Sequence, residues 1–133
     1  GLFNPVVYKP SAELPDEEYP FYLTTGRILY HYHTGTMSRR VEGLNAIAPC
    51  GLLEINPSDA CQLDIKDGDV VRVVSRRGSI MPQVEITDRV APGVVFLNFH
   101  YKEVAANTLT NAVYDPISGI PEYKVSAVRV ERR

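Results

Sequence analysis

The sequence predicts a single, mainly β domain with a few short helices, folded as a β-barrel. Ten prolines and nine glycines among 133 residues indicate many turns between short elements. Roughly six short runs rich in valine, isoleucine and leucine lie between these turns, as in small barrels. The chain is long enough to bury one hydrophobic core. Few, short helical patterns interrupt the strands.

The first part of the chain predicts a linker, a strand and a loop. Residues 1–19 contain three prolines and an acidic run without periodicity, and they predict an extended linker from an upstream domain. The domain itself is then expected over residues 20–133. Phe21–Thr25 is a compact apolar and β-branched run, which predicts a buried strand stopped by Gly26. Residues 30–40 are aromatic and polar without a period, and they predict a long ordered loop.

A second strand and a short helix are expected next. Leu52–Ile55 predicts the strand, and residues 57–63 predict the helix. Asn56 can cap this helix, because its side chain can accept from a free N–H of the first turn. Ala60 and Leu63 are expected to point inward. Asp64, Asp67 and Asp69 stand beside turns, where aspartate commonly bonds the backbone, so a structural role is expected for them.

The rest of the chain predicts a hairpin, two more strands and one helical turn. The hairpin joins two strands through a turn at residues 77–79. In chain order the expected elements are strand Val70–Ser75, strand Ile80–Ile86, strand Val94–Leu97, a helical turn within 104–112 and strand Val125–Val130.

Charge and hydropathy exclude several partner classes. The net charge of −2 gives no electrostatic reason to expect nucleic acid or an anionic membrane as partner. No stretch approaches the roughly 18 apolar residues that a membrane span needs, so direct membrane insertion is not expected. Basic pairs occur at Arg39–Arg40, Arg76–Arg77 and Arg132–Arg133, and short runs of this kind usually form solvated faces.

The sequence contains no recognisable catalytic motif or metal site. It lacks a GxSxG elbow, a P-loop, a GxGxxG run and a CxxC pair. Cys50 and Cys61 have no metal-ligand spacing and suggest neither a disulfide framework nor a zinc site. His31 and His33 form an HxH pair, but the remaining histidine, His100, lies far along the chain, so metal ligation is not expected.

One region has the chemistry of a ligand site. Thr24–Arg27 ends a buried strand, and an aromatic, histidine-rich segment follows directly. Gly26 would let a ligand approach the backbone, and neighbouring N–H groups with Arg27 can receive a phosphate. Residues 30–33 add flat rings and hydrogen-bonding groups. These residues predict an anion or nucleotide site of unknown identity, and a well-packed loop with exposed aromatics is the alternative.

Four segments carry a resemblance to a known family. They are TTGRILYHYHTGTMSRR (24–40), INPSDACQLDIKDGDVVRVVSRRG (55–78), FLNFHY (96–101) and NTLTNAVYDPISGIPEYK (107–124). Together they resemble the C-terminal domain of the molybdopterin oxidoreductases of the dimethyl sulfoxide reductase family. The lead-in SAELPDEEYPF (11–21) is most similar to formate dehydrogenase catalytic subunits.

This resemblance implies a fold, a cofactor and a set of contacts. The fold is a double-psi β-barrel that closes over bis(molybdopterin guanine dinucleotide) carrying molybdenum or tungsten. The implied cofactor-binding residues are Thr25, Gly26, Arg27, Ile28, Leu29, Tyr30, His31, His33, Thr34, Phe99, Asn107, Tyr123 and Lys124. Of these, Arg27 and Lys124 would offset phosphate charge, and Asn107 would read a base edge. No catalytic residue or metal ligand is expected in this chain, and any iron–sulfur cluster belongs to upstream domains.

The resemblance also implies a parent reaction, the two-electron oxidation of formate to carbon dioxide. The same domain of a nitrate reductase, or a subunit of a formylmethanofuran dehydrogenase, is the alternative within the family. A double-psi barrel that recognises other proteins, as in the N-terminal domains of some AAA ATPases, is the alternative outside it. The expected partners are upstream domains of the same subunit and electron-transfer subunits. The expected location is the cytoplasm, or the periplasm if the full-length parent carries an export signal.

Overall fold

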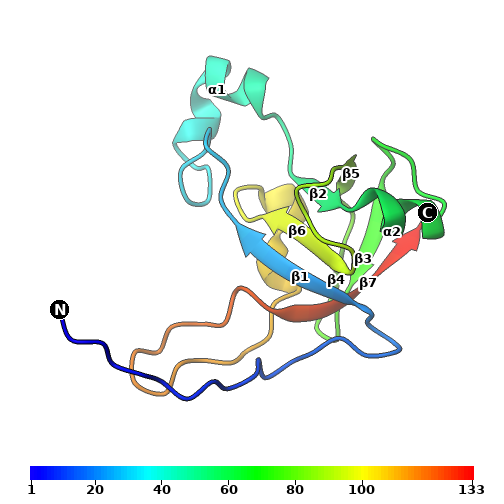
Figure 1. The fold of residues 1–133 in the computed structure, drawn as a ribbon. Coiled ribbons are helices and arrows are strands. Elements are labelled where there is room, and N and C mark those ends of the chain that lie inside the picture. Colours follow the sequence, from blue (N-terminus) through cyan, green and yellow to red (C-terminus); the bar gives the residue numbers. More distant parts are fainter.

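Seven short strands form the body of the molecule (Figure 1). A computed structural model describes all residues, 1–133. The strands are β1 Phe21–Gly26, β2 Leu52–Ile55, β3 Val71–Val74, β4 Ser79–Ile80, β5 Gln83–Ile86, β6 Val94–Asn98 and β7 Ser126–Arg132. They lie in the order β4-β3-β7-β1-β6-β2-β5. The mainly β fold class is therefore confirmed.

The sheet is mixed and curls into a barrel. β1 runs parallel to β6 and β2 parallel to β5, while the other neighbours are antiparallel. The sheet closes because the segment that leads into β5 bonds to β3. There the Val71 N–H donates to the Pro82 carbonyl at 3.1 Å. The Val84 N–H likewise donates to the Asp69 carbonyl at 2.8 Å. These bonds leave few strand edges open to water or to other chains. The barrel form implied by the family resemblance is confirmed.

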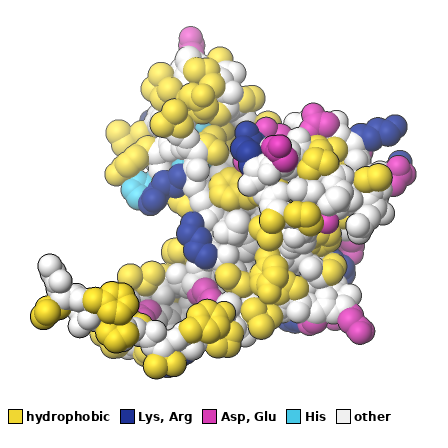
Figure 2. Space-filling model, in the orientation of Figure 1, with side chains coloured by type: hydrophobic (Ala, Val, Ile, Leu, Met, Phe, Trp, Pro, Cys, Tyr) yellow, Lys and Arg dark blue, Asp and Glu magenta, His cyan; other side chains and the backbone are white.

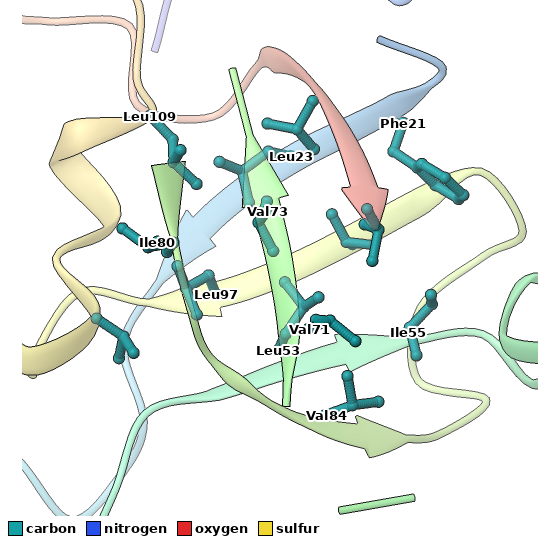
Figure 3. Close-up of a cluster of buried hydrophobic side chains, with 14 of the residues drawn as sticks. Phe21, Leu23, Leu53, Ile55, Val71, Val73, Ile80, Val84, Leu97 and Leu109 are labelled. Atoms are coloured by element: carbon teal, nitrogen blue, oxygen red, sulfur yellow. The ribbon is translucent and has the colours of Figure 1, made fainter. Parts of the chain in front are cut away.

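The barrel is filled by one apolar cluster (Figure 3). Alternate residues along each strand point inward, since side chains in a strand change face at every step. Leu23 of β1, Leu53 of β2 and Leu97 of β6 are completely buried at its centre. Val71 and Val73 of β3 face them from the opposite wall. Full burial of each such side chain contributes about 1.5–3 kcal/mol.

One strand expectation is wrong. Ile80–Ile86 is not a single strand that pairs with the preceding one. Within this segment β4 pairs with β3, the antiparallel contact resumes at the Val70–Gln83 bridge, and β5 then pairs in parallel with β2. The break falls at Met81–Pro82, because proline has no N–H to continue the ladder. The change of partner after this break lets the sheet close on itself.

The helices are short. α2 (Pro57–Gln62) begins as expected: the Asn56 side chain accepts from the Ser58 N–H at 3.0 Å, and Ala60 is buried. α1 (Glu42–Ile47) was not predicted, and neither it nor the 3-10 turn Ser38–Arg40 buries a residue. Two further 3-10 turns, Lys102–Val104 and Ala106–Thr108, stand close to the one expected helical turn. The structure contains no helix that could span a membrane.

The aspartates beside the turns bond the backbone or an arginine. The Asp67 carboxylate accepts from the Ile86 N–H, and the Asp69 carboxylate from the Lys66 N–H, each at 2.8 Å. Asp64 adopts a positive φ of 52° and pairs with Arg132 of β7. The structural role expected for these three residues is confirmed.

The N-terminal segment has no regular structure, and residues 1–10 are exposed. Residues 11–19, here called the N-terminal strap, lie against the barrel. The Glu13 carboxylate forms salt bridges with Arg77 at 2.8 Å and with Arg76 at 2.7 Å. Arg76 also forms a salt bridge with Asp16. The Arg76 guanidinium lies 4.5 Å from the centre of the Tyr19 ring. This arginine pair is therefore a clasp for the strap and not merely a solvated face.

Candidate functional site: a basic cleft at the ends of β1 and β6

The candidate site begins where β1 and β6 end. The two strands are parallel, and Gly26 stands opposite Asn98 at their carboxyl ends. The Phe99 N–H donates to the Gly26 carbonyl at 3.3 Å, which extends the pairing by one residue. Loops from neighbouring parallel strands leave on the same side of a sheet, a common place for ligand sites. The loop after β1 and the segment after β6 therefore lie together.

These two segments enclose a cleft of about 410 Å³. Thr34, Gly35 and Thr36 form one wall, and Phe99 and Asn107 belong to the other. Gly35 has a φ of 72°, and a Cβ there would stand 2.9 Å from the His100 carbonyl oxygen. A glycine is thus needed for the two walls to approach so closely.

Three basic side chains line this cleft: Arg39, Arg40 and Lys102. Arg39 is committed to the protein, because it bonds Glu103 at 3.0 Å and lies 4.8 Å from the Tyr101 ring centre. The hydrogen bond from Arg39 holds the pKa of Glu103 below its usual range. Arg40 and Lys102 have no carboxylate partner. Their charges are free to meet an anion.

Arg27 and Ile28 line a second hollow of about 400 Å³, together with Phe96. The guanidinium carbon of Arg27 lies 5.5 Å from the Phe99 ring centre, within cation–π range. Because Phe99 also lines the cleft, this contact joins the two hollows. A ligand long enough to reach from one to the other would pass over Arg27 and Phe99.

Thr25, Tyr123 and Lys124 form an anchor between β1 and the segment before β7. The Thr25 hydroxyl donates to the Tyr123 carbonyl at 2.8 Å, and the Lys124 ammonium donates to the Thr25 carbonyl. Thr25 is buried, whereas Tyr123 and Lys124 are exposed. An ammonium has three donors, so Lys124 keeps others for a ligand.

A glycine is needed at position 26 for a different reason from the ligand approach that the sequence suggested. A Cβ at Gly26 would stand 2.6 Å from the Phe96 ring, so the space beside it is already filled by protein. The glycine is needed for packing against Phe96 whether or not a ligand approaches. Leu29 and Tyr30 are exposed beyond it, and His33 is exposed with a positive φ of 47°.

His31 is buried and bonded to the protein through both ring nitrogens. Nε2 donates to the Ala48 carbonyl at 2.8 Å, and Nδ1 lies 3.1 Å from the Ser38 hydroxyl oxygen. That oxygen also accepts from the Tyr32 N–H at 3.0 Å. In this conformation His31 braces the loop, and its nitrogens are not free to meet a ligand. The structure brings together no three His, Cys, Asp or Glu side chains in an arrangement that could hold a metal ion.

His100 is a residue of this region that sequence reasoning did not select. It is fully buried, and its ring nitrogens bond the Ile28 N–H and the His33 carbonyl. Burial lowers the pKa of His100, although the bond to the His33 carbonyl opposes that shift. Its place within FLNFHY, between two aromatic residues at a strand end, was the available signal.

The expected residues thus fall into adjoining groups. Thr34, Phe99 and Asn107 meet in the cleft, and Arg27 and Ile28 lie in the neighbouring hollow. Arg39 and Arg40 were missed because their short basic run was expected to be solvated, and Lys102 was missed because it stands in no basic run. Figure 2 shows basic side chains in the hollow between the lobe that carries α1 and the N-terminal extension. Their function as cofactor contacts remains a prediction.

Relatives of known name match almost the whole chain. The F420-dependent formate dehydrogenase subunit alpha of Methanocaldococcus jannaschii is 52% identical over 99% of this chain. The F420-dependent formate dehydrogenase 2 and 1 subunits alpha of Methanococcus maripaludis are each 48% identical over 99% of it. The chain spans 20% of the length of each of these relatives.

Solved structures and a family comparison agree with the fold. Acetylene hydratase from Pelobacter acetylenicus matches with a TM-score of 0.77 and 14% identity, over 88% of this chain and 19% of that one. Residues 21–127 match the family described as the molydopterin dinucleotide binding domain. This range contains both strands that frame the cleft and the segments that line it. The chain therefore belongs to the molydopterin dinucleotide binding domain family.

Proposed function

We propose that this chain binds bis(molybdopterin guanine dinucleotide) as the C-terminal domain of an oxidoreductase catalytic subunit that oxidises formate. The observation that carries the proposal is the cleft in which Phe99, Asn107 and the unpaired cations Arg40 and Lys102 converge. Residues 20–133 would form the domain, and residues 1–19 would lead into it from upstream. When bound, the cofactor would supply the molybdenum or tungsten centre for the redox chemistry.

The donor set of the cleft fits such a group. A dinucleotide carries phosphate charge, and Arg40 and Lys102 have no carboxylate that would compete for them. Asn107 is exposed at the cleft and offers both a donor and an acceptor to a base edge. Phe99 offers a flat face, with Arg27 stacked on it. The buried Asn98 side chain at the end of β6 has an oxygen with no partner, so this region contains an acceptor that a ligand could use.

Formate is the proposed substrate because the relatives of about 50% identity are named formate dehydrogenases. These relatives are also named F420-dependent, which makes F420 the first electron acceptor to test. A nitrate reductase and a formylmethanofuran dehydrogenase remain the alternatives, since the residues that select the substrate would lie in other domains. This chain alone would not turn over substrate.

The upstream part of the same subunit is the proposed partner. Neither α1 nor the 3-10 turn Ser38–Arg40 buries a residue, and Met37, Val41 and Ile47 are exposed there. Figure 2 shows hydrophobic side chains over this lobe and along the N-terminal extension. Apolar surface of this kind usually marks an interface. Electron-transfer subunits would bind elsewhere on the parent enzyme.

The test is the metal and guanine content of the full-length subunit, purified anaerobically from its source. Near-stoichiometric molybdenum or tungsten, with about two guanines per metal, is the expected result because each of the two pterins carries one guanine. Formate-dependent reduction of F420 by the same preparation would then support the substrate and the acceptor. Absence of both metal and guanine would contradict the proposal.

A further inference from the structure

His100 connects two points of the loop that follows β1. Its Nε2 lies 3.0 Å from the backbone nitrogen of Ile28, and its Nδ1 bonds the carbonyl of His33. These partners are 72 and 67 residues away in the sequence, and the side chain is fully buried. One imidazole thus fixes both the start and the far end of the loop from residue 28 to residue 33.

The two bonds require one protonation state. A backbone N–H can only donate, so Nε2 must be without a hydrogen in order to accept from Ile28. A carbonyl can only accept, so Nδ1 must carry the hydrogen that goes to His33. Only the neutral ring protonated at Nδ1 satisfies both. Protonation of Nε2 would break the bond to Ile28 and set two N–H groups against each other.

The surroundings of His100 also oppose a positive charge. Arg27, His31 and His33 of the loop face it, and Tyr101 stands beside it. The cleft cations Arg39, Arg40 and Lys102 line the same cavity. The nearby Glu103 is already paired with Arg39. No free carboxylate stands in contact to compensate a protonated ring.

We propose that His100 is a positioning residue, which holds the 28–33 loop so that Arg27 and the cleft wall at Thr34 stand ready for an anionic ligand. This inference rests on the proposed function for the identity of that ligand, but the loop clamp itself does not. His100 is not proposed to touch the ligand. Its effect on binding acts through the backbone of Ile28 and His33.

The matched variants are His100→Phe and His100→Gln in the full-length subunit. Phenylalanine keeps a ring but offers no hydrogen bond. Glutamine offers one acceptor and a donor group, and it does not titrate. The measurement is hydrogen exchange of the amides of residues 28–34, followed by mass spectrometry. The amides of β3 and β7 in the same sample are the internal control.

In His100→Phe we expect the loop amides to exchange about tenfold faster, because the Ile28 N–H and the His33 carbonyl lose their partner. The control strands should keep their protection. His100→Gln should restore most of the loop protection and the metal and guanine content that His100→Phe loses. In the wild-type protein, loop exchange corrected for its intrinsic pH dependence should rise as the pH falls below about 6.5, the usual pKa of histidine. His100→Gln should lack this response.

Two results would overturn the inference. One is unchanged loop exchange in His100→Phe, and the other is the same corrected pH response in wild type and His100→Gln. If His100→Phe does not fold, the comparison of loop exchange against pH in the wild type and His100→Gln still tests the inference. If the loop responds as expected but the wild-type protein carries no metal or guanine, the clamp stands and the proposed function fails.

Discussion

The barrel and the segment after β1, residues 27–50, are held in place by different forces. This segment is called the loop layer below. The barrel has a cluster of 18 buried apolar residues, and its strands bond one another in register. The loop layer depends on single side chains that bond distant backbone groups, such as His31 to Ala48 and His100 to Ile28. The helix α1 contributes no buried residue.

Because of this difference, the barrel and the loop layer should affect different properties of the protein, its stability and its ligand binding. Apolar burial is roughly proportional to area and has no direction, so the barrel tolerates changes that keep its volume. A hydrogen bond from one side chain to one backbone group cannot be shared among neighbours. Changes in the barrel should therefore alter unfolding, and changes in the loop layer should alter ligand retention at nearly constant stability.

The largest effect on stability is expected from Leu53→Ala. Leu53 is fully buried in β2, where its strand pairs with both β5 and β6. Truncation leaves a cavity in a closed barrel that cannot collapse easily, and it should lower the free energy of unfolding by about 2–5 kcal/mol. Urea unfolding measures the change. Leu53→Met keeps the volume and should cost much less; equal losses would argue against a close-packed core at this point.

Gly26→Ala probes the boundary between the two regions. The added Cβ would stand 2.6 Å from the Phe96 ring, so that ring must shift. Overpacking of this kind costs about 1–3 kcal/mol. Thermal unfolding should report the loss, and ligand retention should fall with it because β1 leads directly into the site. Gly43→Ala is the control, since a Cβ there meets nothing within 4 Å.

The strands were largely predictable because each is a short run of apolar residues between turn residues. The exception is Ile80–Ile86, where hydrophobicity continues although the strand does not. The break at Pro82 is a local signal that was available. The pairing of β5 with β2 was not, because it depends on closure of the barrel by residues far apart in sequence.

The site was predictable in outline and not in its internal bonds. Of the residues that the family resemblance implied, Thr34, Phe99 and Asn107 line the cleft, and Arg27 and Ile28 line the neighbouring hollow. Their role as cofactor contacts stays a prediction. The bonds from His100 to Ile28 and His33 could not be predicted, because these residues come close to His100 only after β1 and β6 pair. α1 was missed because Glu42–Ile47 buries no face, and an apolar stripe is the main signal of a helix.

A smaller effect is expected from Arg77→Ala, which opens the clasp on the N-terminal strap. Arg77 bonds the Glu13 carboxylate and also donates from Nε to the Leu109 carbonyl at 3.0 Å. Its loss should lower the free energy of unfolding by about 1–2 kcal/mol, because the Leu109 carbonyl and Glu13 lose a charged donor. Arg133→Ala is the control. Faster proteolysis within residues 11–19 would locate the change in the strap.

Acid should weaken the same clasp in the wild-type protein. Burial raises the pKa of Glu13, but the hydrogen bonds from Arg77 and Arg76 outweigh it and hold that pKa below the usual 4.5. A depressed carboxyl pKa contributes stability that is present above pH 4.5 and lost as the pH falls through the folded-state value. Unfolding measured downward from about pH 6, where the Glu13 carboxyl is fully ionised, should show a shallower acid slope in Arg77→Ala. Identical slopes would mean that Glu13 is not held by Arg77.

The smallest change in stability, and the clearest loss of binding, is expected when Arg40 and Lys102 are both replaced by alanine. Neither has a carboxylate partner, so the free energy of unfolding should stay within about 0.5 kcal/mol of the wild-type value. Removing two cations from the cleft should nevertheless lower guanine retention by the full-length subunit about tenfold or more, because charge-assisted bonds to phosphate are strong. Arg72→Ala, at an exposed position on β3, removes a cation away from the cleft and should retain guanine normally. Equal retention in the double variant and the wild type would remove these two cations from the site and leave Arg27 and Lys124 as the groups that meet the phosphates.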